Sequence, residues 1–517
     1  MELTQSLHRA VQINPEGLAI VYGERRRSWR QFGDAVARAA AMLRAAGVVA
    51  ETKVAIVSAN SERFVECLYA VPWVGGVLVP INFRLQIDEI AYIVEHADVE
   101  VVLFEEAFAP VVDELRRRSP RLRTCFVMDV AQSALDGAVD YGAAAANAPP
   151  CGDEQRGGDD LAAIFYTGGT TGVPKGVMIT HDNLFQFLLT FLVSERIDST
   201  LVHLHVVPMF HLSCIGVLMT TAVAGTHVIL PKFEPEEALR AIHEHRVTHC
   251  LSVPLMFERM AFHPDVGRYD LSSLRMLGYG ASPMPPRILE EARLRFPALQ
   301  FAQGYGMTEA PGPVYLGPEY HTREAVEAGR ARAAGRSVPT CHIRVVDADD
   351  REVARGTVGE IVIRGPVVMK GYWKNPQLTA QALRGGWMHT GDAGYMDEDG
   401  FVYVTDRIKD MIISGGENVY STEVEAVVAR HPDVVQCAVI GVPSDRWGEA
   451  VHAIVVTRPG ASVTKEQLTD FCRERLAGYK CPRSIEIRDE PLPVTAAGKL
   501  LKAKLREPFW AGRARKI

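Results

Sequence analysis

The sequence predicts an α/β protein with a large N-terminal domain of layered sheets and helices and a small α+β C-terminal domain. Three observations support this prediction. The chain has 517 residues, which is too long for one simple hydrophobic core. Strand-like and helix-like runs alternate along most of the chain, as in α/β layers. From about Gly386 the pattern changes to a turn, short strands and helices, which indicates a separate unit of about 100 residues.

Apolar runs and helical spacing predict the individual elements. The predicted strands are residues 53–57, 99–104, 434–441 and 450–456, and the predicted helices are 29–46, 87–95, 422–430 and 465–476. Residues 397–404 read as a turn that feeds a strand, as in a hairpin. Residues 136–158 are rich in Ala, Gly, Pro and Asp and predict a surface excursion, and 324–336 predict a helix-to-loop passage. We place the domain boundary so that residues 1–408 and 409–517 form the two domains.

The composition is that of an ordinary soluble globular protein, with 47% hydrophobic and 23% charged residues. A net charge of −7 gives no electrostatic footprint for nucleic acid. The nine cysteines are odd in number and lack C-x-x-C spacing, which argues against a disulfide framework and a zinc site and fits a reducing cytoplasm. The first residues lack the pattern of a signal peptide. The apolar runs 70–81 and 214–230 predict buried core rather than a transmembrane segment, while peripheral membrane contact and a homodimer stay open.

The most informative segment is residues 166–176, Tyr-Thr-Gly-Gly-Thr-Thr-Gly-Val-Pro-Lys-Gly. Glycines allow several backbone N–H groups to face one anion, and the threonine hydroxyls and Lys175 add donors and a positive charge. The apolar run 161–166 predicts a buried strand that holds the loop. The segment is not a common P-loop, because Pro174 precedes Lys175 and Gly176 follows it. A flexible surface loop is the alternative for an isolated glycine-rich stretch. The pattern predicts a clamp for a polyphosphate.

This loop resembles the phosphate-binding signature of the adenylate-forming superfamily, which comprises acyl- and aryl-CoA synthetases, adenylation domains of peptide synthetases and firefly luciferase. Further motifs follow in the family's order. They are Pro-Met-Phe-His at 208–211, Gly-Tyr-Gly-Met-Thr-Glu at 304–309, Gly-Trp-Met-His-Thr-Gly-Asp at 386–392, the run 406–418, and Pro-Val-Thr-Ala-Ala-Gly-Lys at 493–499. The resemblance therefore covers essentially the whole chain.

The resemblance implies an ATP site and assigns its contacts. The implied ATP-binding residues are Thr167, Gly168, Gly169, Thr170, Thr171 and Lys175 for the β- and γ-phosphates, Gly280, Ala281 and Tyr305 for adenine, Thr308 for the α-phosphate, Asp392 and Arg407 for the ribose, and Lys499 bridging the acid and the α-phosphate. Thr308, Lys499 and His211 take the catalytic roles. An ionised carboxylate only accepts hydrogen bonds, so Asp392 suits a ribose diol.

Glu309 is the implied ligand of Mg²⁺, since one carboxylate with phosphate oxygens and water suits this ion. A solvated loop carboxylate is the alternative for Glu309, an ordinary turn residue for Asp392, and a surface lysine for Lys499. Val494 stands where an arginine is common in relatives, which leaves the contacts of that loop open.

The resemblance makes His211 an aromatic gate of an acyl pocket. The candidate pocket residues are Phe187, His211, Ser213, Val253, Tyr279, Gly306, Met307 and Pro311. His203 and His205 would share one strand face with each other, but no nearby Cys or carboxylate completes a metal set, and core histidines are the alternative. The pocket is mostly apolar and offers neither a cation for a second carboxylate nor an aspartate for an α-ammonium group. A fatty or an aryl acid remains, and the sequence favours a fatty acid.

The acceptor of the acyl group is expected to be coenzyme A. No nucleophile triad is recognisable, and no carrier module with a pantetheine-bearing serine follows the last motif. The segments containing Gly415, Gly416 and Trp447 resemble coenzyme A contacts of stand-alone ligases, and Arg84 and Lys480 are candidates for its phosphates. By resemblance, Lys409 is the hinge about which the C-terminal domain moves.

The expected function is therefore an ATP-dependent carboxylic acid–CoA ligase that acts through an acyl-AMP intermediate. Loading of a separate carrier protein, a luciferase-like oxygenase and an inactive nucleotide sensor are the alternatives.

Overall fold

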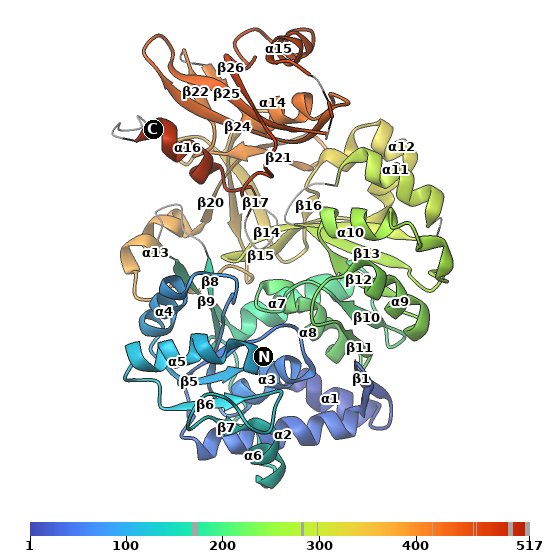
Figure 1. Cartoon of the computed structure of the whole chain (residues 1–517), viewed down its shortest axis with the longest axis vertical. Coiled ribbons are helices and arrows are strands. Elements are labelled where there is room, and N and C mark those ends of the chain that lie inside the picture. The colour runs from blue at the N-terminus through green and yellow to red at the C-terminus, as the bar shows by residue number, and fades with distance from the viewer. Residues whose placement is uncertain are drawn as a thin grey trace. The chain divides into compact units, whose positions relative to one another are not determined.

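The computed structural model describes residues 1–167, 174–280, 284–296, 298–415, 417–458, 460–461, 463–494 and 500–511 (Figure 1). It divides into two compact units: Met1–His342 with Ile363–Met388, and Ile343–Val362 with His389–Ile517. A large α/β unit and a smaller unit built on sheets confirm the predicted fold class. The predicted boundary after residue 408 lies inside the second unit, and the position of the hinge stays a prediction.

The first unit contains two large sheets in its described residues. One sheet has the strand order β16-β15-β14-β13-β12-β10-β11-β1-β2. Its strands are β1 (Leu18–Tyr22), β2 (Arg25–Ser28), β10 (Val202–His205), β11 (Thr226–Ile229), β12 (His249–Ser252), β13 (Met276–Gly280), β14 (Gln300–Met307), β15 (Ala310–Leu316) and β16 (Arg336–Ser337). The central strands pair in parallel, and β15 returns antiparallel to β14 as a hairpin.

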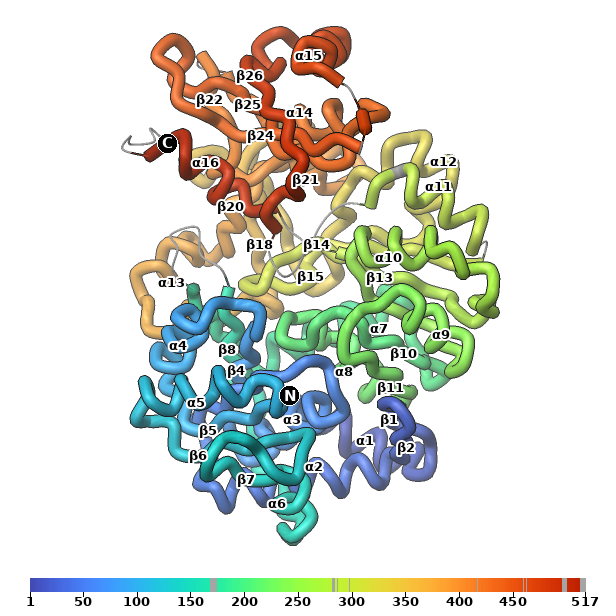
Figure 2. The backbone as a smooth tube through the Cα atoms, in the orientation of Figure 1, coloured from blue at the N-terminus to red at the C-terminus, as the bar shows by residue number. Residues whose placement is uncertain are grey.

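Helices cover both faces of this sheet (Figure 1, Figure 2). One face carries α9 (Pro235–His245), α10 (Pro254–Ala261) and α11 (Pro286–Arg295), each with a proline in its first turn, where a missing N–H costs nothing. The other face carries α7 (His181–Ser194) and α8 (Ile215–Ala222). Strand alternation separates the faces: Phe301 of β14 packs on Phe257 of α10, whereas Gly304 faces Phe191 of α7.

The second sheet of this unit has the order β19-β9-β8-β4-β3-β5-β6-β7. Its strands are β3 (Lys53–Val57), β4 (Val77–Pro80), β5 (Val99–Phe104), β6 (Thr124–Val127), β7 (Val139–Asp140), β8 (Leu161–Thr167), β9 (Lys175–Thr180) and β19 (Gly371–Tyr372). The remaining helices of the unit are α1 (Gln5–Ile13), α2 (Trp29–Ala45), α3 (Glu62–Trp73), α4 (Ile87–His96), α5 (Ala109–Arg118), α6 (Tyr141–Asn147), α12 (Arg323–Glu327) and α13 (Pro376–Ala382). The predicted strands 53–57 and 99–104 match β3 and β5, whose continuous apolar runs suit buried parallel strands.

One segment is more regular than the sequence predicted. Residues 136–158 were expected to form a surface excursion, but they contain β7 and α6. The Asp140 carboxylate caps α6 by accepting a hydrogen bond from the Ala143 N–H, and the buried Tyr141 hydroxyl donates to Glu66. A cap and one anchored aromatic therefore give this small-residue segment its helix.

The second unit contains two smaller sheets, with orders β17-β18-β20-β21 and β23-β22-β25-β24, and β26 adds to β25. Its elements are β17 (His342–Val346), β18 (Gly359–Arg364), β20 (Met388–Met396), β21 (Val402–Arg407), β22 (Ile412–Ser414), β23 (Glu417–Val419), α14 (Ser421–Val428), β24 (Val434–Ser444), β25 (Gly448–Thr457), α15 (Lys465–Arg473), β26 (Ser484–Arg488) and α16 (Lys502–Trp510). Alternate residues of β25 enter two cores: Val451 packs with α14 and α15, and Ile454 packs with α16.

The apolar runs 70–81 and 214–230 are buried in helices and strands of the first unit, as predicted. Within the described part of the chain, no helix combines the length and the apolar character that a membrane crossing needs.

Candidate active site

The two ends of the phosphate loop are fixed by an antiparallel strand pair. Thr167 at the end of β8 pairs with Lys175 at the start of β9. A side chain on Gly176 would place its Cβ 2.9 Å from Ile164 Cγ2 and 3.0 Å from the Tyr166 ring, so this close packing requires glycine. The predicted contacts Gly168, Gly169, Thr170 and Thr171 lie outside the described residues.

Tyr166 anchors the first end of the loop. Its hydroxyl lies 2.7 Å from His96 Nδ1. Burial, followed by the charge of Lys374, lowers the pKa of His96, so the neutral ring accepts a hydrogen bond from the Tyr166 hydroxyl. The residue before Thr167 is thus held by a hydrogen bond.

Thr308 and Glu309 form the tip of the β14–β15 hairpin. Met307 pairs with Ala310, so these two residues make the turn, and both are half-buried. The register shifts between Tyr305 and Met307, and a Cβ on Gly306 would lie 2.6 Å from the Gly312 nitrogen. The bulge therefore needs glycine at position 306. The bulge fixes the direction in which the turn with Thr308 and Glu309 projects from the sheet.

Tyr372 connects Glu309 with Lys175. The Tyr372 hydroxyl donates a 2.9 Å hydrogen bond to Glu309 Oε1, and Lys175 Nζ lies 5.6 Å from the centre of the Tyr372 ring. β19 pairs with β9 through Tyr372 and Val177, which holds the ring next to the loop. Burial, and then Glu309, raises the pKa of Tyr372, so the hydroxyl keeps its proton. The structure thus brings together the predicted phosphate lysine and the predicted metal carboxylate.

Tyr372 was missed from the sequence. Its role depends on two partners that are far away along the chain, and 63 positions separate it from Glu309. The available signal was the short run Gly371-Tyr372-Trp373, which puts two aromatic residues after a glycine.

Glu309 fits the magnesium ion that the family implies. One carboxylate oxygen is held by Tyr372, and no residue in the described part of the chain donates a hydrogen bond to Oε2. A single oriented carboxylate leaves the remaining positions of Mg²⁺ to phosphate and water, as this ion prefers. When bound there, the ion would neutralise phosphate charge.

The predicted adenine contacts lie at the ends of parallel strands. Gly280 ends β13 and pairs with Gly304, whose carbonyl oxygen would be 2.9 Å from a Cβ at position 280. Tyr305 is half-buried in β14, on the face opposite to Gly304. Ala281 lies outside the described residues.

Asp392 and Arg407 form an ion pair in the second unit. They are paired residues of β20 and β21, and Arg407 Nε lies 2.8 Å from Asp392 Oδ1. Asp392 is buried within a strand rather than in a turn, and its N–H donates to Thr390 Oγ1 at 3.0 Å. The pair is thus held in a defined arrangement that presents donors and acceptors together, as a ribose diol requires.

Residues around the predicted hinge are tied to the C-terminal helix. Arg506 of α16 donates to the Lys409 carbonyl at 3.0 Å and pairs with Asp410. Lys502, at the start of α16, pairs with Glu425 at 2.7 Å. Burial lowers the pKa of Lys409. Lys499 lies outside the described residues.

Two of the predicted coenzyme A contacts touch each other. The Gly415 N–H donates to the Trp447 carbonyl at 2.8 Å, and a Cβ on Gly415, whose φ is +64°, would lie 2.8 Å from Trp447 Cε3. The guanidinium groups of Arg446 and Arg483 lie 4.7 and 5.1 Å from the indole ring. Arg446 belongs to the segment that resembled coenzyme A contacts, whereas Arg483 was not predicted. Gly416 lies outside the described residues.

The two predicted phosphate cations lie in different surroundings. Lys480 Nζ contacts both oxygens of Glu423, at 2.7 and 2.8 Å, so it already has a counter-charge. Arg84 is exposed, and its guanidinium lies 5.8 Å from the Phe83 ring. Phe83 contacts Phe210, which contacts His211, with ring centres 5.2 and 4.6 Å apart. Two phenyl rings therefore link Arg84 to the predicted gate.

The predicted acyl-pocket residues are only partly brought together. Phe187 of α7 lies against Gly312 of the hairpin that also contains Gly306, Met307 and Pro311. Val253 caps α10, and the Ser213 hydroxyl donates locally to the Pro208 carbonyl. The Tyr279 side chain packs in the α10–α11 core and its hydroxyl bonds His321 Nε2 at 2.8 Å. It is on the opposite face of the sheet from Phe187.

The three histidines His203, His205 and His227 are buried side by side. His205 Nε2 lies 3.0 Å from His227 Nδ1, whereas neither ring nitrogen of His203 has a hydrogen-bond partner in the described part of the chain. No group of metal-ligating side chains occurs among the residues that the structure describes. His205 is thus a buried histidine with a hydrogen-bond partner, whereas His203 is buried without one among the described residues.

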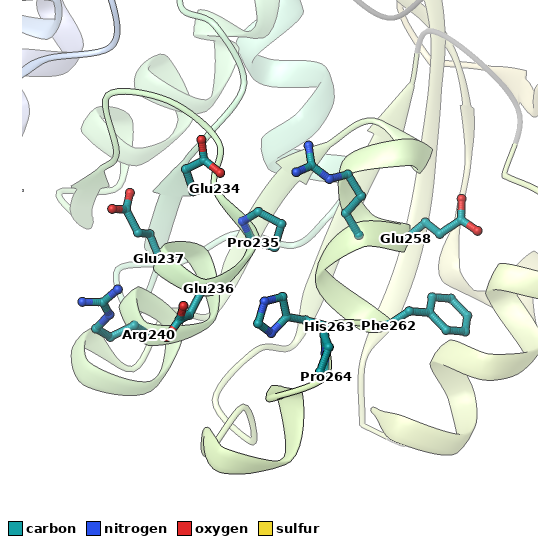
Figure 3. Close-up of a pocket in the computed structure, with 10 residues that line it drawn as sticks. Glu234, Pro235, Glu236, Glu237, Arg240, Glu258, Phe262, His263 and Pro264 are labelled. Carbon is teal, nitrogen blue, oxygen red and sulfur yellow. The ribbon is translucent and has the colours of Figure 1, made fainter. Parts of the chain in front are cut away.

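A surface depression of about 720 Å³ lies elsewhere in the first unit (Figure 3). It is lined by acidic and basic residues in and next to α9 and α10, and Glu258 and Phe262 extend away from Glu234 and Glu237. Glu258 pairs with Arg287. It contains none of the predicted site residues, so it has no part in the site above.

Comparisons with known proteins place the chain in a family. The AMP-binding enzyme family matches residues 7–373, and the C-terminal domain of AMP-binding enzymes matches 423–499. A feruloyl-CoA synthase of Amycolatopsis sp. is 38% identical over 97% of this chain and 98% of its own. A fatty acid–[acyl-carrier-protein] ligase, ScoC of Streptomyces coeruleorubidus, is 35% identical over 99% and 97%. The ATP-bound MatB structure of Rhodopseudomonas palustris aligns with a TM-score of 0.88, 30% identity and 99% coverage of both chains. The chain therefore belongs to the AMP-binding enzymes, the adenylate-forming superfamily that includes the acyl-CoA synthetases, as its motifs predicted.

Proposed function

We propose that this enzyme activates an aryl carboxylic acid with ATP and transfers the acyl group to coenzyme A. The class of enzyme, an AMP-forming acid–thiol ligase, follows from the family and from its curated relatives. The kind of acid, the acceptor and the roles of single residues are the proposal.

One observation carries the proposal: Lys175 and Glu309 converge on Tyr372. A cation at the end of the phosphate loop and an oriented carboxylate at a hairpin tip are the groups needed to hold the β- and γ-phosphates and a magnesium ion. If the loop were a surface loop without function, nothing would require its terminal lysine to lie near an oriented carboxylate.

In the first half-reaction, a carboxylate oxygen of the acid attacks the α-phosphorus of ATP, and the bond to the leaving pyrophosphate breaks. Lys175 holds the departing phosphates, and the Thr308 hydroxyl donates to the α-phosphate. Asp392 and Arg407 bind the ribose, and Lys499 neutralises charge between the acid and the α-phosphate.

In the second half-reaction, the sulfur of coenzyme A attacks the acyl carbon, and AMP leaves with the electron pair of the broken C–O bond. The thiol proton passes to solvent. Trp447 with its two flanking arginines offers an aromatic face and positive charge to the nucleotide end of coenzyme A. Lys409 is the proposed hinge. Rotation about it would withdraw the Lys499 segment after the first half-reaction and present the Trp447 surface for the second.

The sequence favoured a fatty acid because the pocket residues are mostly apolar. An aryl acid is favoured by Phe187 and Phe191, whose rings meet edge-to-face at 5.2 Å and 80° and form an aromatic wall against the hairpin. The relative named feruloyl-CoA synthase supports the same class. A fatty acid is the second candidate, supported by the relative ScoC.

The acceptor also has a second candidate, since ScoC is named for an acyl carrier protein. We propose coenzyme A because two guanidinium groups lie close to the Trp447 ring, where they add positive charge to an aromatic side chain. A cytoplasmic location is part of the proposal, supported by nine cysteines that are all free thiols.

The test is acid-dependent pyrophosphate exchange with benzoate, cinnamate, ferulate, octanoate and palmitate, followed by mass analysis of the product formed with coenzyme A or with a phosphopantetheinylated carrier protein. We expect exchange and a CoA thioester with the aryl acids. Exchange with alkanoates alone would show that the substrate is a fatty acid and not an aryl acid. Acylation of the carrier protein but not of coenzyme A would show that the carrier protein is the acceptor. No exchange with any acid would leave a nucleotide sensor and refute the proposal.

A further inference from the structure

A buried acid, Glu195, continues the aromatic wall of α7. Phe187, Phe191 and Glu195 are spaced by four residues and therefore lie along one side of the helix. Phe187 faces Gly312, Phe191 faces Gly304, and Glu195 Oε1 would be 3.6 Å from a Cβ on Gly278. These three side chains lie progressively farther from the hairpin tip, and Glu195 lies about 12 Å beyond Phe187 along the helix axis.

The Glu195 carboxyl has no hydrogen-bond partner among the residues that the structure describes. The residue is 9% exposed, its Oε1 is buried without a hydrogen bond, and no described residue forms an ion pair with it. Burial alone raises the pKa of Glu195 to about 8, so at neutral pH the carboxyl is mostly protonated and both donates and accepts. An unpaired buried carboxyl is costly for the folded protein and calls for an explanation.

A second unpartnered group faces the same layer. Tyr315 of β15 is the paired residue of Gly304, so its side chain lies on the α7 face, and its ring centre is 6.2 Å from that of Phe191. The Tyr315 hydroxyl is buried, and no described residue forms a hydrogen bond with it. Burial, and then Glu195, raises the pKa of Tyr315, which indicates that the two groups influence each other.

Two separate elements, α7 and β15, thus each contribute a buried polar atom that has no hydrogen-bond partner among the described residues. Neither polar atom makes a hydrogen bond to any residue that the structure describes. Both lie at the end of the layer remote from Thr308 and Glu309. An acid whose carboxylate reacts at the hairpin tip would present its distal end to them.

We propose that Glu195 and Tyr315 form the polar end of the acyl pocket and bind a hydroxyl group on the distal end of the substrate, which makes the substrate a phenolic acid. This inference rests on the proposed acid–CoA ligase function. A phenolic hydroxyl both donates and accepts, so it satisfies a protonated carboxyl and a tyrosine hydroxyl together. An acid without that hydroxyl leaves both groups unpaired, and this is how such a site discriminates.

The experiment compares 4-hydroxycinnamate with unsubstituted cinnamate, which differ by that hydroxyl alone. The value of kcat/KM for CoA-thioester formation is measured for each acid with the full-length enzyme and with Glu195→Leu, Glu195→Gln and Tyr315→Phe. Glu236→Gln, in the surface depression, is the matched control. The ratio of the two acids is the readout, because a variant that is merely less stable loses both activities together.

We expect the wild-type enzyme to prefer 4-hydroxycinnamate by about tenfold or more. Glu195→Leu should remove most of this preference by lowering the activity with 4-hydroxycinnamate, while activity with cinnamate stays within about threefold of wild type. Glu195→Gln and Tyr315→Phe should each keep part of the preference, because one partner of the hydroxyl remains. Glu236→Gln should leave the ratio unchanged.

The inference is overturned if the wild-type enzyme turns over both acids equally, or if Glu195→Leu keeps the wild-type ratio. If Glu195→Leu does not fold, the ratio of kcat/KM for the two acids is measured in Glu195→Gln and Tyr315→Phe instead. A wild-type ratio in both variants refutes the proposal that Glu195 and Tyr315 form the polar end of the pocket. In these cases cinnamate is still converted, so the ligase function stands. Failure to activate any acid would instead refute the ligase function and the inference with it.

Discussion

Replacing Tyr372 by phenylalanine tests whether this tyrosine orients Glu309, the proposed magnesium ligand. The substitution removes the hydroxyl that donates to Glu309 Oε1 at 2.9 Å. It keeps the aromatic ring 5.6 Å from Lys175 and leaves the backbone pairing of β19 with β9 in place. Only the orientation of the carboxylate should change.

The size of the effect follows from the hydrogen bond. A hydrogen bond to a charged group contributes about 1.5–3 kcal/mol, and because Glu309 is half-buried we take the lower half of that range. A loss of about 1.5–2 kcal/mol corresponds to a fall of roughly 10- to 30-fold in kcat/KM for ATP. The deficit should shrink as magnesium is raised, since the loosened carboxylate mainly weakens metal binding.

The assay is acid-dependent pyrophosphate exchange at a series of magnesium concentrations, with the melting temperature recorded in parallel. Tyr269→Phe is the matched control, because it removes a similar tyrosine–glutamate hydrogen bond, to Glu236 at 3.2 Å, on the exposed surface. The control should behave as wild type. If Tyr372→Phe shows the wild-type magnesium dependence and kcat/KM, or if it merely melts earlier, Tyr372 does not position Glu309 and the reasoning fails.

Three further predictions follow from other parts of the chain. Trp447→Ala should raise the KM for coenzyme A by about tenfold while pyrophosphate exchange is unchanged; a matching loss of exchange would mean general damage. Lys499→Ala should abolish pyrophosphate exchange yet still make thioester from synthetic acyl-AMP, and equal losses in both assays would contradict the two-step use of the C-terminal segment. The pKa of Glu195 is raised from 4.5 to about 8, so the folded state holds a proton that the unfolded state releases. Wild-type stability should therefore fall, relative to Glu195→Gln, by up to about 1.4 kcal/mol per pH unit between pH 4.5 and 8 and level off above. Melting curves at pH 5, 7 and 9 check this, and a constant difference would contradict the raised pKa.

Local patterns predicted the fold where a segment is defined by its own residues. The strands β3 and β5 appear as continuous apolar runs, and α2 and α4 follow from their helical spacing. By contrast, α6 was read as part of a loop because its anchors, Asp140 and buried Tyr141, are single residues in a segment of alanines.

The site was predictable only as far as the motifs reach. The two motif residues Lys175 and Glu309 were named from the sequence, but Tyr372, which joins them, acts through strand pairing and a distant hairpin. Glu195 was missed for a different reason. A glutamate that follows an apolar helix normally marks the solvated end of that helix, and only the packing of α7 against β13 shows that this one is buried.

The β14–β15 hairpin separates two tasks along its length. Its turn contains Thr308 and Glu309, the proposed groups for phosphate chemistry, whereas its stem, with Gly304, Gly312 and Tyr315, faces the α7 layer. On the proposed function, residue changes in the stem therefore alter which acid is accepted without disturbing the turn. Evolution or protein engineering could therefore change the substrate through the stem residues while the residues of the activation step stay the same.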